Sequence, residues 1–375
     1  MNTQQQQEKL QRHLGYLEQD NNNVTLLLAI SDLYRQLRDG NGAQRYLDEA
    51  KRLSTQPFWA HQGLLHLDLK QIDPAKYALT QALIEEDTPT NRYQLAFCLY
   101  LNRDFNDALA VLNAPDNPLS NSAILLKAKI LHHLQQADEA IVILEQLIIT
   151  QNSDAETLGL LALLHFDNNS IDRAEFLSTQ ALAINAADSN GQLVRILLKT
   201  LGNDVTIEEI ESLLTIMPEE SRLWFALGTT EMRDMNFSAA EIAFAKATQI
   251  GPEFYDGWIS LGWCHLLQDN LDKAETTYQQ AVKIDADDAD GWGGLALVNA
   301  LRGNSTEAKQ WLEKTRPSDS ECFLAAVTQI IIANQENPNQ AVRHLHTALP
   351  DLPAEVNQIL TAAILNINDG GTTFN

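Results

Sequence analysis

The chain has 375 residues, of which 45% are hydrophobic, and 50 acidic residues against 26 basic ones give a formal net charge of −24. This acidity argues against a nucleic-acid backbone or an anionic membrane surface as the main partner. It permits a basic or apolar partner, although it is also a common means of keeping a protein soluble. No apolar run approaches the roughly 18 residues that a membrane-spanning helix needs.

The cysteines and the first residues of the chain bear on its location. Cys98, Cys264 and Cys322 are an odd number of thiols in distant parts of the sequence, with neither metal-ligand spacing nor the pattern of a disulfide framework. The first residues, MNTQQQQEKLQRHLGYLEQD, lack the basic and apolar regions of a signal peptide. We therefore expect a reducing, cytoplasmic location.

The first predicted element is an amphipathic helix over residues 4–20. Leu10, Leu14 and Leu17 form one stripe, and glutamine and charged residues cover the opposite face. Asn21 to Asn23 then interrupt the pattern. Such a helix suits the end of a stack of helices, so we expect residues 1–23 to form an N-terminal cap.

Residues 24–189 repeat a pattern of two short apolar helices around a polar turn. Small residues recur at matching places, as at Ala43 and Ala50 in one copy and Ala75 and Ala82 in the next. A single hairpin of this kind cannot bury its apolar face, so we expect neighbouring hairpins to stack. Five such copies fit this region, which we treat as an N-terminal arc.

Residues 190–220 depart from the pattern. The small-residue columns are missing, and Gly202, Asn203 and Asp204 replace the usual turn. The second helix is expected to start at Thr206, with Glu209 three residues later as a capping box. We predict a degenerate repeat here, and a possible bend between two arcs.

Residues 221–350 form the predicted C-terminal arc, and its first three copies are the most regular part of the chain. Trp224, Trp258 and Trp292 stand 34 residues apart. Each is followed three residues later by leucine, then by glycine or alanine, and further on by an alanine and a large apolar residue. The first copy closes with Pro252. The spacing predicts two helices in each copy, with small residues that allow close approach.

This W-x2-L-G, A-x3-F, P pattern at a period of 34 resembles the bacterial type of tetratricopeptide repeat (TPR). The resemblance extends over nearly the whole chain. It implies an all-α superhelix, a solenoid of about nine to ten helical hairpins. It also implies that the first helix of each repeat lines a concave groove where partners bind.

The C-terminal region is predicted to end in one more helix within residues 351–375, introduced by Pro350 and Pro353. Its apolar stripe would cap the last repeat, or alternatively join two copies of the chain into a weak homodimer. The tail from Asp369 is expected to be mobile.

Known catalytic motifs do not occur in the sequence. We find no glycine-rich phosphate loop, HExxH sequence, nucleophile elbow or CxxC pair. His132 and His133 are adjacent, so on a helix they point about 100° apart and cannot chelate one metal together. Acidic runs such as Asp285 to Asp290 suit turns and helix N-termini. We expect neither catalysis, nor a cofactor, nor a metal.

The family geometry, transferred to this sequence, gives a set of predicted groove positions. The apolar and aromatic character of this set differs from the carboxylate-clamp members of the family, which use lysine, asparagine and arginine at these sites. The groove positions are Tyr93, Phe97, Tyr100, Leu125, Lys129, His132, Gly159, Phe225, Thr229, Arg233, Ile259, Trp263, Leu266 and Gly293.

The function implied by this groove is that of a non-catalytic adaptor or scaffold. The partner would be a protein segment with apolar anchors and basic flanks. Alternatives are a secretion-type chaperone that shields an apolar segment, or a small-molecule pocket inside the superhelix near Trp263 and His265. The same side chains could also simply pack helix against helix.

Overall fold

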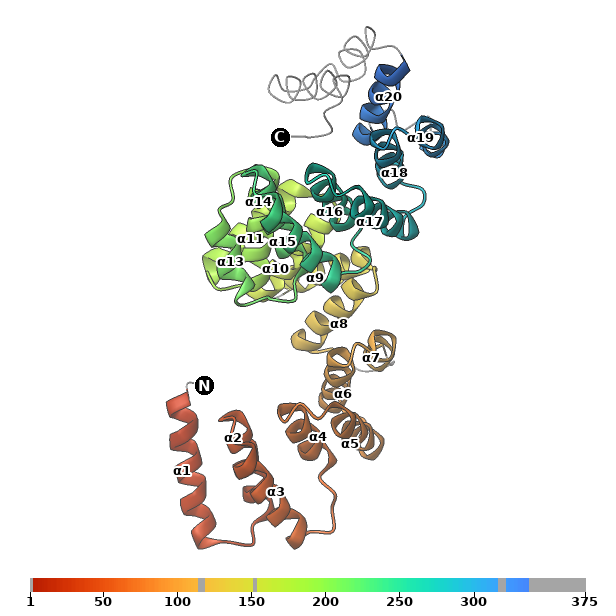
Figure 1. Ribbon diagram of the computed structural model, residues 1–375. Coiled ribbons are helices and arrows are strands. Elements are labelled where there is room, and N and C mark those ends of the chain that lie inside the picture. Colours follow the sequence, from red (N-terminus) through yellow and green to blue (C-terminus); the bar gives the residue numbers. More distant parts are fainter. Residues whose placement is uncertain (1–2, 114–118, 151–153, 316–321, 337–375) are drawn as a thin grey trace. The chain divides into compact units, whose positions relative to one another are not determined.

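The computed structural model describes residues 3–113, 119–150, 154–315 and 322–336 (Figure 1). Every regular element in these ranges is an α-helix, and the helices follow one another as antiparallel pairs. The all-α solenoid of helical hairpins predicted from the sequence is confirmed. Nine hairpins lie within the described ranges.

The chain divides into two compact units, Met1–Ile184 and Asn185–Asn375, and each is described by itself. In the first unit, a single helix precedes five hairpins. The helices are α1 (Thr3–Gln19), α2 (Val24–Gln36), α3 (Gly40–Leu53), α4 (Trp59–Asp68), α5 (Ile72–Glu85), α6 (Pro89–Leu101), α7 (Phe105–Leu112), α8 (Asn121–His133), α9 (Ala137–Thr150), α10 (Ala155–Asp167) and α11 (Ile171–Ile184).

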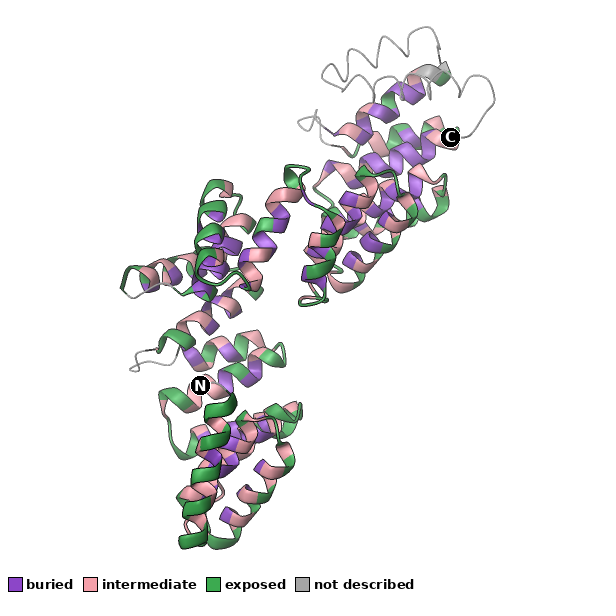
Figure 2. Cartoon of the chain, turned by 90° about the vertical axis from the view of Figure 1, so that its left-hand side faces the viewer, coloured by how far each residue is buried: buried purple, intermediate pink, exposed green. Residues whose placement is uncertain are grey.

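The second unit contains four hairpins and one further helix in its described part. These are α12 (Ser189–Leu201), α13 (Ile207–Leu214), α14 (Ser221–Arg233), α15 (Phe237–Ile250), α16 (Tyr255–Leu267), α17 (Leu271–Ile284), α18 (Ala289–Leu301), α19 (Ser305–Leu312) and α20 (Phe323–Glu336). Within each unit, buried residues line the facing sides of packed helices and exposed residues cover their outer sides (Figure 2).

One backbone geometry closes all nine hairpins. The residue two places after the first helix adopts a left-handed conformation, and the next N–H donates to the carbonyl five residues earlier, as from Asp39 to Tyr34 at 2.9 Å. This Schellman-type closure satisfies carbonyls that the helix end leaves unpaired. The left-handed positions are Arg38, Lys70, Arg103, Gln135, Asn169, Asn203, Met235, Asp269 and Gly303.

Close approach within the hairpins of the second unit depends on glycine beneath an aromatic ring. A Cβ atom built on Gly228 would lie 2.7 Å from the ring of Phe244. The next repeat places Tyr278 over Gly262, and Gly294 lies against the same ring, so that an added Cβ would meet it at 2.6 and 2.4 Å. The glycine column of the sequence is therefore explained by ring packing.

The three aligned tryptophans share a hydrogen bond that the sequence did not predict. The indole N–H of Trp224, Trp258 and Trp292 donates to the carbonyl six residues earlier, at 2.8, 2.8 and 2.9 Å. Each ring therefore ties the start of its helix to the loop that leads into it.

Several sequence predictions can be compared with these elements. The predicted N-terminal helix is α1, and its Leu10 is buried against α2. The region from 190 to 220 forms the α12–α13 hairpin with the ordinary turn geometry at Asn203, and the capping box of Thr206 and Glu209 is present. The bend stays a prediction. The C-terminal capping helix, its tail and dimerisation through it lie outside the described residues.

The non-glycine residues with left-handed backbone allow a first test of this description of the hairpin turns. For an L-residue this conformation costs roughly 1–2 kcal/mol. Glycine avoids this cost, but it loses more conformational entropy on folding, which offsets part of the gain. Met235 and Gln135 are exposed and have φ values of 61° and 60°. Met235→Gly and Gln135→Gly should each raise the free energy of unfolding by about 0.5–1 kcal/mol, measured by urea denaturation. Asn169→Gly is the matched control with a smaller gain, because asparagine tolerates this conformation. Lower stability of the first two variants would contradict this account of the turns.

Tyr278 provides a second test. Its side chain is 0% exposed, and its hydroxyl has no hydrogen-bond partner among the described residues. An unsatisfied buried hydroxyl costs about 1–3 kcal/mol. Tyr278→Phe should therefore leave the fold intact and raise the melting temperature. The reciprocal change at the same place in the preceding repeat, Phe244→Tyr, should lower it. A drop in melting temperature for Tyr278→Phe would show that the hydroxyl is satisfied.

Candidate functional site

Three aromatic side chains form one face of α6. Tyr93, Phe97 and Tyr100 follow at four- and three-residue spacing, so they share a side of the helix. The rings of Tyr93 and Phe97 lie nearly parallel, with centroids 6.2 Å apart and planes at 15°. Phe97 remains 37% exposed although it is fully apolar. Tyr100 is partly covered by Phe105 and His133, with ring centroids 5.9 and 5.6 Å away, so Phe97 is the part of this face that stays open to solvent.

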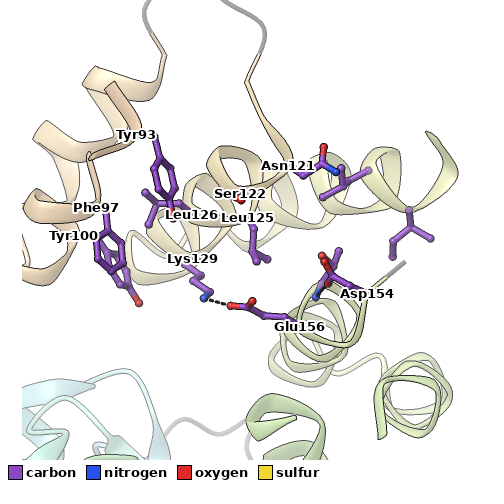
Figure 3. Close-up of a pocket in the computed structure, with 13 residues that line it drawn as sticks. Tyr93, Phe97, Tyr100, Asn121, Ser122, Leu125, Leu126, Lys129, Asp154 and Glu156 are labelled. Carbon is purple, nitrogen blue, oxygen red and sulfur yellow. Dashed lines mark hydrogen bonds and ion pairs between the residues drawn. The ribbon is translucent and has the colours of Figure 1, made fainter. Parts of the chain in front are cut away.

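Residues of three further helices, α8, α9 and α10, complete a pocket beside these rings (Figure 3). Helix α8 contributes Leu125 and Lys129, and the start of α10 contributes Glu156. The pocket has a volume of about 200 Å³. Its other lining residues, in chain order, are Asn121, Ser122, Leu126, Leu147, Ile148, Asp154 and Thr157.

Charge in the pocket is unevenly distributed. Lys129 Nζ lies 2.6 Å from Glu156 Oε1, and this ion pair links α8 to α10. Asp154 caps α10 by accepting a hydrogen bond from the backbone N–H of Thr157 at 2.7 Å. Among the described residues that line the pocket, two carboxylates thus face one ammonium group. The pocket carries a net negative charge beside an aromatic wall.

Five of the predicted groove positions thus meet in one pocket, and two others of the first unit lie outside its lining. The ring of His132 is further along α8, with Nε2 2.7 Å from Asp167 Oδ2 of α10. Gly159 is buried inside α10. Neither residue presents a free side chain to this pocket.

In the second unit, the groove positions on α14 are engaged within the chain. The Phe225 ring packs against Phe254 and Phe244 at centroid distances of 5.1 and 5.5 Å. Thr229 donates its hydroxyl to the carbonyl of Phe225. Arg233 donates to two backbone carbonyls of the loop before α13, that of Asn203 at 3.0 Å and that of Val205 at 3.3 Å.

The groove positions on α16 and α18 meet the last described helix or the core around it. Trp263 packs against Phe323 with ring centroids 5.8 Å apart, and Ile259 lies at the edge of the same apolar cluster. Leu266 is buried. A Cβ on Gly293 would lie 2.8 Å from Cys322 Sγ, so its small size allows α20 to approach α18. Packing between repeats accounts for these residues.

Burial shifts the ionisation of groups that might otherwise act chemically. Burial raises the pKa of the Cys98 thiol to about 11 and those of Cys264 and Cys322 to about 12, so the three thiols stay protonated at neutral pH. Burial also lowers the pKa of His265, although the nearby carboxylate of Glu241 opposes this shift. His265 is itself buried, and its neighbours Cys264 and Leu266 are buried core residues.

Sequence reasoning missed the pocket residues at the start of helices. Asn121 and Ser122 follow the N-cap Ser120, whereas Asp154 is itself an N-cap. N-cap patterns in the sequence could have located these helix starts. They could not have shown that the first turns of α8 and α10 lie beside the aromatic face of α6, because that depends on how the repeats stack.

Two other kinds of site do not occur in the described ranges. No group of three or more histidine, cysteine, aspartate or glutamate side chains there is arranged to hold a metal ion. No helix there is long and apolar enough to cross a membrane.

Comparison with known proteins agrees with this architecture. Residues 68–147 match the family described as anaphase-promoting complex, cyclosome, subunit 3, and residues 232–298 match the tetratricopeptide repeat family. The chain belongs to the tetratricopeptide-repeat family. No curated protein sequence matches this TPR protein significantly.

Solved structures resemble this TPR protein at low sequence identity. A monomeric mutant of IFIT1 with m7Gppp-AAAA has 14% identity and a TM-score of 0.51, covering 92% of this chain and 89% of that one. The human IFIT1 dimer with PPP-AAAA has the same identity and coverages and a TM-score of 0.50. A tetratricopeptide repeat protein from Parabacteroides merdae has 16% identity and a TM-score of 0.44, covering 68% and 97%. At these identities the similarity concerns the fold alone.

The buried histidines predict a pH dependence of stability. Burial lowers the folded-state pKa of both His165 and His265, against the opposing carboxylates of Glu145 and Glu241. The unfolded chain therefore binds these protons first, and folding stability is lost as pH falls through about 6.5. The melting temperature should drop between about pH 7.5 and 5.5. The double variant His165→Gln/His265→Gln should show a shallower drop, and a parallel drop in both proteins would contradict this assignment.

Proposed function

We propose that this protein is a non-catalytic scaffold that holds a segment of a partner protein against the concave side of its first unit. Tetratricopeptide repeats generally mediate protein–protein interaction. The proposal rests above all on the pocket between α6, α8 and α10, because there five predicted groove positions come together without being filled by the chain itself.

Exposure of the aromatic wall favours this use. A partly exposed phenylalanine next to two tyrosines is a surface that a partner would desolvate, and aromatic side chains commonly carry much of the binding energy at interfaces. The lining also offers the hydroxyl group of Ser122 for hydrogen bonding. Apolar anchors on the partner, with basic flanks, would match this surface.

The size of the pocket weighs against the small-molecule alternative. Pockets for small molecules usually span about 300–1,000 Å³, whereas this one has about 200 Å³. That volume suits one or two side chains of a bound segment. The secretion-type chaperone would use the same surface for an apolar segment, so it remains a variant of the proposal. A cytoplasmic location, expected from the sequence, belongs to the proposal as well.

A display library of random peptides, selected on the full chain, tests this proposal. Selected peptides should bind the wild type and lose affinity for Phe97→Ala by tenfold or more, or about 1.4 kcal/mol, in fluorescence anisotropy. Phe176→Ala is the matched control, because Phe176 of α11 is also exposed, at 51%, but lies outside the pocket. Equal affinity for the two variants would contradict the assignment of this surface.

A further inference from the structure

We propose that the pocket between α6, α8 and α10 is an arginine-recognition pocket, which takes an arginine side chain of the bound segment. This inference rests on the proposed function and names the chemistry of its anchor. It follows from three features of the pocket: its size, its aromatic wall and its excess of carboxylate.

The size of the pocket favours a side chain of the bound segment, rather than a whole small molecule, as the occupant. The volume of about 200 Å³ is too small for most organic ligands, and the pocket is open to solvent beside Phe97. A segment lying across the three helices could therefore insert one side chain while its backbone stays outside. Ser122, near the start of α8, lines the pocket as well and carries a hydroxyl group that could bond to that backbone.

The aromatic wall favours a flat cation. Guanidinium groups stack on aromatic faces and are more weakly hydrated than ammonium groups, so they lose less on entering such a site. Tyr93 and Phe97 are nearly parallel, and Tyr100 continues the row one turn later. The row runs along the wall opposite α10, as Figure 3 shows.

The carboxylates supply the complementary charge. Glu156 uses Oε1 for Lys129, and Asp154 uses Oδ1 for the N–H of Thr157. Neither Oε2 of Glu156 nor Oδ2 of Asp154 forms a hydrogen bond with a described residue. A guanidinium group presents five N–H donors in a planar fork, which suits two acceptors on one side and a ring on the other.

The negative charge of the pocket also favours arginine over acidic and purely apolar side chains. An acidic segment would meet two carboxylates and a single ammonium group that is already paired. A purely apolar side chain would fit the rings but would bury carboxylate oxygens without a partner, which is unfavourable. The formal charge of −24 on the whole chain adds long-range attraction for a basic segment.

Peptides selected on the full chain test the inference. Their arginine is replaced by citrulline, which keeps the shape and removes the charge, and by lysine, which keeps the charge and removes the planar fork. Each replacement should weaken binding to the wild type about tenfold or more. Glu156→Gln should weaken the arginine peptide to a similar extent and leave the citrulline peptide nearly unchanged, which a double-mutant cycle measures.

Controls keep the two proposals distinguishable. Glu156 is exposed on the first turn of α10, so Glu156→Gln should fold normally, and Glu175→Gln on α11 is a matched surface variant outside the pocket. Peptides that need Phe97 but contain no arginine, or that tolerate citrulline, would overturn the arginine pocket and leave the proposed function standing. Peptides indifferent to Phe97→Ala would overturn both.

Discussion

The most regular hairpins of this protein depend on a close contact between their two helices that only small residues permit, as at Gly228 and Gly262. Most of the helices have between 8 and 14 residues, and a helix of that length is marginal without tertiary packing. Where Gly262 lies under the ring of Tyr278, an added methyl group would collide with the ring. The ring reaches beyond its own hairpin to Gly294, so the same contact that closes one repeat also joins it to the next. The packing within this hairpin and the stacking of this hairpin on the next therefore depend on the same ring.

This constraint explains why so much of the fold could be predicted from the sequence. A repeat that must place glycine or alanine under a large ring leaves those residues at a fixed spacing, and the tryptophans add a third column. Even the irregular hairpin from Ser189 to Leu214 keeps the same turn, because its left-handed residue is asparagine, which adopts that backbone with little strain. The missing small-residue columns hid this regularity from the sequence analysis.

The candidate site was predicted less completely, and for a physical reason. Family geometry indicates which side of each first helix faces inward, but it does not indicate whether the next repeat covers that side. Tyr93 and Phe97 face a pocket, whereas Trp263 packs against Phe323 and Gly293 lies beneath α20. The difference depends on side chains in the following repeat, which no single motif contains. The carboxylates of Asp154 and Glu156 are not among the predicted positions, because acidic residues at a helix start suit capping whether or not they also line a pocket.

Comparison of the two units suggests how a binding surface arises in such a repeat. In the second unit, where the consensus pattern is strongest, inward-facing aromatic residues pack against neighbouring rings, as Phe225 does against Phe254. In the first unit, His133 of α8 packs against Tyr100, but beside Tyr93 and Phe97 the same helix presents Leu125 and Lys129, and Lys129 pairs with Glu156 of α10 rather than with a ring. The rings of α6 are thus left partly uncovered. Surface ion pairs of this kind add little stability, so the departure from the consensus gives up some packing between repeats. A sequence that breaks its own pattern at one place without gaining stability there is expected to use that place for another purpose.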